Sequence, residues 1–174
     1  TDLGPFDEVI DSGALDGADL TDVRFLVNHD LSKIPLARSR RNNGNSTMRL
    51  SPDQNGLEIE VKLDTENNSD ARALKSAVQR GDISGMSFLF SVNDEEWENL
   101  ESDHPTRRIK KIGSVVEVSA VTFPAYESTE ITARSKEALE NARSALESAR
   151  QQTAKSLESD LELLKAKTKI LGGH

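Results

Sequence analysis

The chain is organised around one stretch, Gly81-Asp82-Ile83-Ser84-Gly85-Met86-Ser87-Phe88-Leu89-Phe90. The first half of this stretch has turn residues, and the second half alternates as a β-strand does. The alternation gathers large apolar side chains on one face: Met86, Phe88, Phe90 and Val92. Ser87 then projects from the opposite face of a strand that the core holds rigid, which suits a nucleophile. A lone serine has no base and no orienting group, so the rest of the chain must supply both.

Composition excludes several classes of function. The 174 residues suit one domain with an appendage, or two small domains. A formal charge of -8 argues against nucleic acid as a partner, because phosphate binding needs a clustered basic surface. We find no run of eighteen apolar residues and no secretory signal, so no membrane association is predicted. Cysteine is absent, which excludes disulfides, thiol nucleophiles and thiolate zinc sites.

Periodicity gives a coarse map of the elements. Alternating apolar residues predict strands near residues 6–10, 23–28, 47–50, 57–63, 85–92, 107–112 and 114–123. A short helix is predicted at residues 71–79, capped by Ser69 or Asp70 and ended by Gly81. Residues 93–106 are acidic and polar and predict a long surface loop, and Gly113 predicts a turn.

Beyond about residue 135 the composition changes to that of a long helix. Apolar residues recur at gaps of three and four up to Leu171, forming one narrow stripe. Such a stripe needs a partner, as in a coiled coil. Self-association or docking on another chain is favoured over folding back on the β domain. We therefore divide the chain into a β domain at residues 1–133 and a helical segment at residues 134–174.

Candidate partners for Ser87 are few, because the chain has three histidines. His29 follows the strand at residues 23–28, from where its ring could reach a neighbouring strand. Considered alone, a surface or capping histidine is its more common role. His104 lies in the acidic stretch, and His174 is terminal. A metal hydrolase using His29 and Asp30 is a weaker interpretation, because further ligands at recognisable spacing are missing.

Glu117 is a carboxylate within an otherwise apolar strand. If that face is buried, Glu117 needs a partner, and a histidine is a natural one. If the face is solvated, Glu117 is an ordinary surface residue, and the two interpretations weigh about evenly. Ser87, His29 and Glu117 together supply the nucleophile, base and orienting acid of a hydrolytic triad. Backbone N–H groups at Gly85 or around residues 124–125 could form the oxyanion hole.

Five motifs, in order along the chain, carry a resemblance to a known family. They are Asp11-Ser12-Gly13-Ala14-Leu15, Phe25-Leu26-Val27-Asn28-His29-Asp30, Asn55-Gly56-Leu57-Glu58-Ile59-Glu60, Arg80 with the opening stretch, and Val116-Glu117-Val118-Ser119-Ala120-Val121-Thr122-Phe123-Pro124-Ala125-Tyr126. Over residues 5–130 the chain resembles the prohead maturation proteases of tailed bacteriophages. The resemblance implies an α+β fold similar to herpesvirus assemblin proteases. That fold is a compact, mainly antiparallel β-barrel with flanking helices, here followed by the long C-terminal helix.

The resemblance also implies a function. Its members are serine endopeptidases that act inside the immature capsid in the host cytoplasm, without metal or cofactor. They remove scaffold and the scaffold-like part of the capsid protein, and they cut themselves. In this family pattern Ser87 matches the nucleophile, His29 the base and Glu117 the third member. Capsid and scaffold proteins would be the partners, and a homo-oligomer is expected. Family chains usually begin with a further strand, so one barrel edge would be missing here or come from another chain.

A second function remains open at this point. The β domain could be a degenerate protease in a non-catalytic capsid-assembly module, with the long helix as a scaffolding coiled coil. Intact Ser87, His29 and Glu117 speak against degeneracy. A histidine base further predicts activity that rises between about pH 6 and 8, because a free imidazole loses its proton near pH 6.5.

Overall fold

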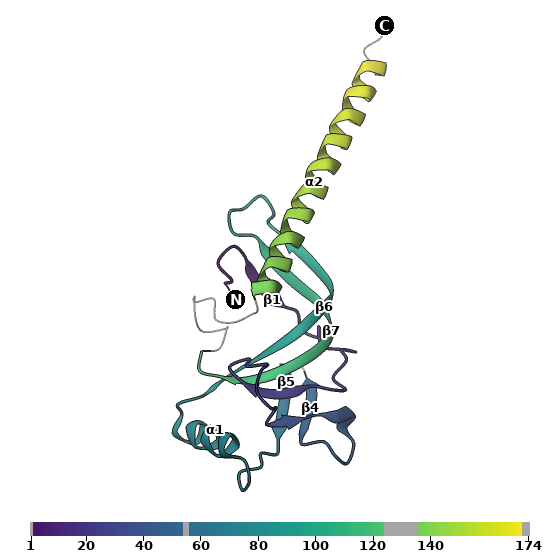
Figure 1. Cartoon of the computed structure of the whole chain (residues 1–174). Helices are drawn as coiled ribbons and strands as arrows, with labels where there is room; N and C mark the ends of the chain where they lie inside the picture. The colour runs from purple at the N-terminus through teal and green to yellow at the C-terminus, as the bar shows by residue number, and fades with distance from the viewer. Residues whose placement is uncertain (1, 54–55, 124–135, 172–174) are drawn as a thin grey trace.

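The structure is a computed structural model that describes residues 2–53, 56–123 and 136–171 (Figure 1). Its strands are β1 (Asp7–Ile10), β2 (Arg24–Val27), β3 (Ala37–Arg38), β4 (Met48–Asp53), β5 (Gly56–Val61), β6 (Gly85–Glu98) and β7 (Thr106–Val121). Its helices are α1 (Ser69–Arg80), α2 (Lys136–Leu171) and a short 3-10 turn, η1 (Arg40–Asn42).

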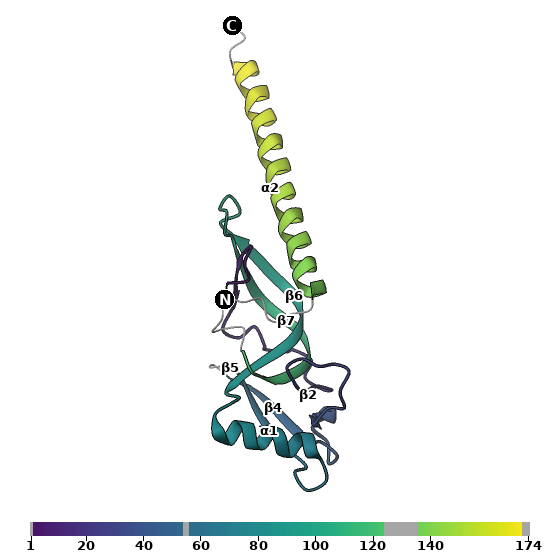
Figure 2. The ribbon, with the colours of Figure 1, turned by 60° about the vertical axis from the view of Figure 1, so that its left-hand side comes forward.

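β7 is the central strand of the larger sheet. β6 pairs with it antiparallel along its whole length, from Thr106 to Val121. β1 pairs with its first half and β2 with its second half, both in parallel. β3 extends the sheet beyond β2, and β4 and β5 form a separate antiparallel hairpin. The long β6–β7 hairpin therefore runs through the molecule and joins its two ends (Figures 1 and 2).

The core lies at the end of the hairpin where β4, β5 and α1 gather (Figure 2). α1 contributes the buried Ala71 and Leu74. Its cap differs from the sequence prediction, because the side chain of Asn68 accepts from the N–H groups of Asp70 and Ala71. Gly81 ends the helix in the left-handed conformation, with φ of 79°, as predicted. The turn half of the opening stretch is thereby confirmed.

Two sequence predictions about the β6–β7 hairpin are wrong. Residues 93–106 do not form a long loop, because β6 continues to Glu98 and pairs with β7. Acidic side chains of this part, such as Glu95 and Glu98, bind Arg107 and Arg108 across the hairpin, so a polar sequence still forms a strand. Gly113 is not a turn but lies within β7.

A close approach explains the glycine at position 113. A Cβ there would collide with the side chain of Asn93 and would lie 2.9 Å from Ser91 Oγ. β6 has irregular register at this point, between Ser91 and Asp94. The glycine therefore accommodates a bulge in the partner strand.

The fold class is α+β, as predicted, and the described part of the chain forms two sheets and two α-helices. Within the described residues the sheets do not close into a barrel. The barrel and the likeness to herpesvirus assemblin therefore stay predictions. In the same part of the chain, no helix is both long and apolar enough to span a membrane.

α2 makes contact with the β domain through its first half. Ala142 and Leu146 are buried, and the Arg150 guanidinium donates to the carbonyls of Leu100 and Ser102 at 3.1 and 3.0 Å. Further along, the helix extends away from the sheet (Figures 1 and 2). In this half of α2, Leu157 is 61% exposed. The first half of the stripe thus folds back on its own chain, which was the less favoured alternative. The boundary predicted at residues 133 and 134 lies outside the described residues.

Candidate active site

His29 sits on a backbone turn directly after β2. Asn28 and His29 both have positive φ, 50° and 56°, which is uncommon for residues other than glycine. Such backbone persists where surrounding contacts hold it, and it is frequent at functional sites. Asn28 N–H donates to the Ala120 carbonyl at 2.9 Å, and Asn28 Oδ1 accepts from Thr122 N–H at 3.0 Å. The turn is therefore fastened to the end of β7.

The turn places the imidazole of His29 in contact with Glu117 of β7. Nδ1 of His29 lies 2.5 Å from Glu117 Oε1. The Glu117 side chain is completely buried, whereas that of His29 is 17% exposed. With Glu117 ionised and the ring neutral, Nδ1–H donates to the carboxylate and Nε2 is left as an acceptor. Of the two interpretations of Glu117, the buried one is right.

Ser119 completes the surroundings of this pair. Its hydroxyl donates to Glu117 Oε2 at 2.6 Å and accepts from the His29 backbone N–H at 3.1 Å. Ser119 is also completely buried. Sequence reasoning gave Ser119 no role. The two-residue spacing was the available signal, because it puts both side chains on one face.

Ser87 lies on β6 directly opposite Ser119 of β7. Side chains that face each other across an antiparallel pair lie on the same face of the sheet. Ser87, Ser119 and Glu117 therefore share one face, and β2 on the other side of β7 delivers His29. Ser87 is half-buried. Within the described residues, the hydroxyl of Ser87 makes no hydrogen bond. A hydrogen bond between Ser87 and His29 therefore stays a prediction.

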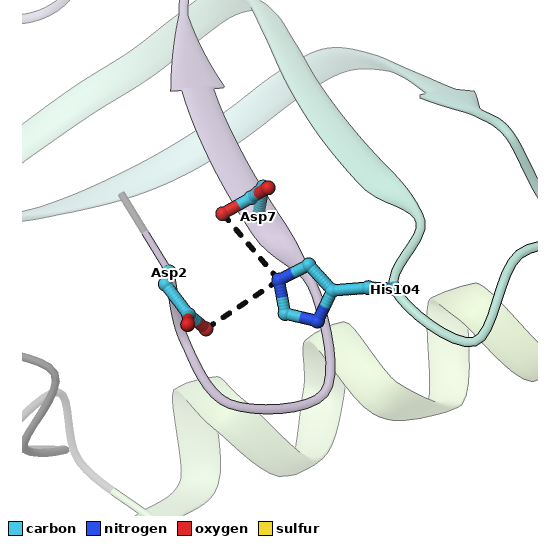
Figure 3. A group of neighbouring side chains, drawn as sticks. All are labelled: Asp2, Asp7 and His104. Carbon is cyan, nitrogen blue, oxygen red and sulfur yellow. Dashed lines mark ion pairs between the residues drawn. The ribbon is translucent and has the colours of Figure 1, made fainter.

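The other candidates lie elsewhere. Ser84 is exposed in the turn before β6. His104 precedes β7, roughly 35 Å along that strand from Glu117, so it is no rival for the third member. Its Nε2 lies 3.5 Å from a carboxylate oxygen of Asp2 and of Asp7 (Figure 3).

A metal site around His29 has no support. Within the described residues, the group of possible ligands is Asp2, Asp7 and His104, which contains neither His29 nor Asp30. The carboxylate of Asp30 instead accepts from the hydroxyl and the N–H of Ser32. These hydrogen bonds lower the pKa of Asp30. The geometry around His29 instead suits proton transfer, because a buried carboxylate holds its ring.

Comparison with known proteins agrees with this chemistry. The family model described as caudovirus prohead serine protease matches residues 1–144. The chain belongs to this family. It is similar to the prohead protease of Enterobacteria phage HK97, with 38% identity over 96 residues. That match covers 54% of this chain and 40% of the relative, so the chain spans less than half of the relative's length. No solved structure matches the chain.

Membership of the prohead serine protease family gives the residues of the site a context. The match reaches from β1 into the first part of α2, so it includes His29 after β2, Ser87 on β6 and Glu117 on β7. The family model extends further than the predicted resemblance, which ended near residue 130. It also includes Ala142, which packs in the part of α2 that contacts the β domain.

Proposed function

We propose that this chain is a serine endopeptidase of phage capsid maturation, with a triad of Ser87, His29 and Glu117. One observation carries the proposal: a completely buried carboxylate contacts a histidine at 2.5 Å, on the sheet face that also bears Ser87. Burying a carboxylate without a cation is costly. The buried Glu117 therefore needs a partner, and the ring of His29 supplies one.

The roles follow from the positions of the atoms. Nε2 of His29 is free to take the proton from Ser87 Oγ as the hydroxyl attacks the peptide carbonyl. Glu117 holds the ring through Nδ1–H and stabilises the imidazolium that forms. The imidazolium then gives its proton to the leaving amine, and water, activated by the same ring, hydrolyses the acyl-enzyme.

The oxyanion donors are also a prediction. Residues 124–125 lie outside the described part of the chain, and Gly85 is the first residue of β6, two residues before Ser87. The N–H of Gly85 is therefore the described candidate for stabilising the negative oxygen of the tetrahedral intermediate.

The proposed substrates are capsid and scaffold proteins inside the immature capsid, together with the protease chain itself. The similar phage protein is named a prohead protease, which supports this class of substrate. A homo-oligomer through the uncovered part of α2 remains part of the proposal, supported by the exposure of Leu157. A mass measurement in solution that returned a monomer at all concentrations would refute that part.

The test of the proposal is a pair of serine variants. Ser87→Ala should abolish cleavage of the cognate scaffold protein, by about 10⁴- to 10⁶-fold, because the nucleophile is lost. Ser84→Ala, three residues earlier and exposed, should cleave normally. Cleavage products are followed by mass spectrometry, and circular dichroism checks that both variants fold. Cleavage by a verified Ser87→Ala protein would refute the assignment.

The alternative is a non-catalytic assembly module. The contact of α2 with the β domain is compatible with it, but the buried His29–Glu117 pair gives such a module no advantage. A structure with Ser87 far from every His29, within and between chains, would favour this second candidate.

A further inference from the structure

We infer that Ser119 is a positioning residue of the site, which fixes the base and the acid relative to each other. This inference rests on the proposed triad, in which His29 is the base and Glu117 the orienting acid. It goes beyond the triad, because Ser119 neither attacks the substrate nor moves its proton.

The geometry points to this role because one hydroxyl holds both partners. Its hydrogen goes to Glu117 Oε2 at 2.6 Å, and its oxygen receives the backbone N–H of His29 at 3.1 Å. Glu117 has its other oxygen on the His29 ring. The three residues thus form a closed ring of hydrogen bonds, in which the ring and backbone of His29 are both fixed to β7.

Two features of the surroundings make this hydroxyl necessary. Glu117 is completely buried, and its described hydrogen-bond partners are the His29 ring and the Ser119 hydroxyl. Without Ser119, one carboxylate oxygen would lose its donor, and the carboxylate could rotate. His29 also has positive φ, so its turn depends on contacts such as the one to Ser119 Oγ.

Ser119 is unsuited to the role of nucleophile. It is completely buried on the central strand β7, and its hydroxyl already donates a hydrogen bond to a carboxylate. Ser87, opposite it on β6, is the more accessible of the two hydroxyls. The pairing of these serines across the strands lets Ser119 support the base while Ser87 meets the substrate.

The chain offers a matched control at Ser39. Ser39 is also completely buried, and its hydroxyl also accepts one backbone N–H, from Val23 at 2.8 Å, and donates to one oxygen, of Leu20 at 3.2 Å. Ser39→Ala removes a similar pair of hydrogen bonds near the core without touching His29 or Glu117. General destabilisation by a lost buried hydroxyl should therefore be similar in the two variants.

The experiment has a kinetic and a spectroscopic arm. In the otherwise unchanged chain, Ser119→Ala should lower kcat by about 10- to 100-fold with little change in KM, because the reacting groups lose alignment. Ser39→Ala should leave kcat unchanged at a temperature at which both variants are folded. Ser119→Thr keeps the hydroxyl and should recover most of the loss.

The spectroscopic arm uses the Ser87→Ala background, which prevents self-cleavage. The His29 Nδ1 proton, held by a buried carboxylate, should give a low-field proton resonance, which His29→Gln identifies by its loss. We expect Ser119→Ala to remove or broaden this resonance, and Ser39→Ala and Ser119→Thr to retain it. The resonance does not depend on Ser87, so this arm tests the positioning role even if the nucleophile is assigned wrongly.

The outcomes distinguish a failure of the positioning role of Ser119 from a failure of the proposed function. An unchanged resonance and an unchanged kcat in folded Ser119→Ala would overturn the positioning role. Equal losses in Ser119→Ala and Ser39→Ala would also overturn it, because they would show a general effect on stability. Cleavage by Ser87→Ala, in contrast, would refute the proposed function and leave the resonance to decide on Ser119. If Ser119→Thr does not fold, the comparison of the two alanine variants still decides.

Discussion

The charged side chains on the two halves of β7 differ in their partners and in their burial. In the first half, Arg107, Arg108 and Lys110 project from the strand and bind acidic side chains of the neighbouring strands and of Asp11. These groups are partly exposed, apart from the buried Glu8. In the second half, Glu117 is completely buried and meets a histidine ring and a serine hydroxyl. The strand thus carries a network of ion pairs at one end and a single buried carboxylate at the other.

The difference bears on the role proposed for Glu117. Hydrogen bonds from Arg108 lower the pKa of Asp11 and of Glu98 and raise that of the arginine itself. A carboxylate already compensated by a fixed cation gains little when another charge forms beside it. The described partners of Glu117 are the His29 ring and the Ser119 hydroxyl, so in the proposed mechanism an imidazolium on His29 is the cation that Glu117 would stabilise. In the first half of β7, arginine and lysine pair with carboxylates, whereas in the second half a buried carboxylate contacts the proposed base.

The largest expected effect comes from removing the charge of Glu117. Glu117→Gln should lower kcat by about 10²- to 10⁴-fold, because the amide can neither fix the Nδ1–H tautomer nor stabilise the imidazolium. Glu98→Gln, in the other half of the hairpin, should leave kcat unchanged, although it removes a contact to Arg108. Single-turnover cleavage of a peptide substrate measures both variants.

Circular dichroism and thermal unfolding serve as controls for this pair. If both glutamine variants lost activity equally while folded, the two halves would not differ in function, and the comparison would fail. If neither lost activity, Glu117 would be a structural residue, and the triad would lack its acid.

A smaller effect is expected on the pH dependence of stability when the ion pairs of Arg108 are removed. The pKa values of Asp11 and Glu98 are lowered in the folded chain, from ordinary values of 3.8 and 4.5. A lowered folded pKa adds stability above the unfolded value, and this stability is lost as pH falls through the folded value. Arg108→Gln should therefore lower the unfolding temperature at pH 6 and make it less dependent on pH between 5 and 3.

The matched control for acid unfolding is Arg143→Gln on α2, where the arginine lies 3.9 Å from the exposed Glu140. This exposed pair should contribute little, so its variant should follow the wild-type chain. An Arg108→Gln protein with an unchanged pH dependence would show that the ion pairs of the first half of β7 do not stabilise it.

The two halves of β7 also differ in how much of their structure the sequence predicts. Ser87 on the free face of a strand, His29 after a strand and Glu117 within an apolar strand all follow from alternation, which local sequence encodes. The continuation of β6 to Glu98 does not follow from local sequence, because acidic residues have low strand propensity on their own. Their partners Arg107 and Arg108 come later in the chain, and only pairing brings the charges together.

The contacts of the site were less predictable than its residue types. The positive φ of Asn28 and His29 depends on hydrogen bonds to Ala120, Thr122 and Ser119, which are about ninety residues away in sequence. The contact of Ser119 with His29 could not be predicted from local sequence, because it forms only when β2 pairs with β7. Parallel pairing of distant strands is set by the whole fold, so a local pattern cannot reveal it.

The most direct test of the central claim is covalent labelling of the full chain with a fluorophosphonate, followed by peptide mapping. The account predicts one phosphonylated residue, Ser87, whose labelling is lost in His29→Ala and reduced in Glu117→Gln. Label on Ser84 or Ser119, or label on Ser87 that is unaffected by His29→Ala, would contradict the triad.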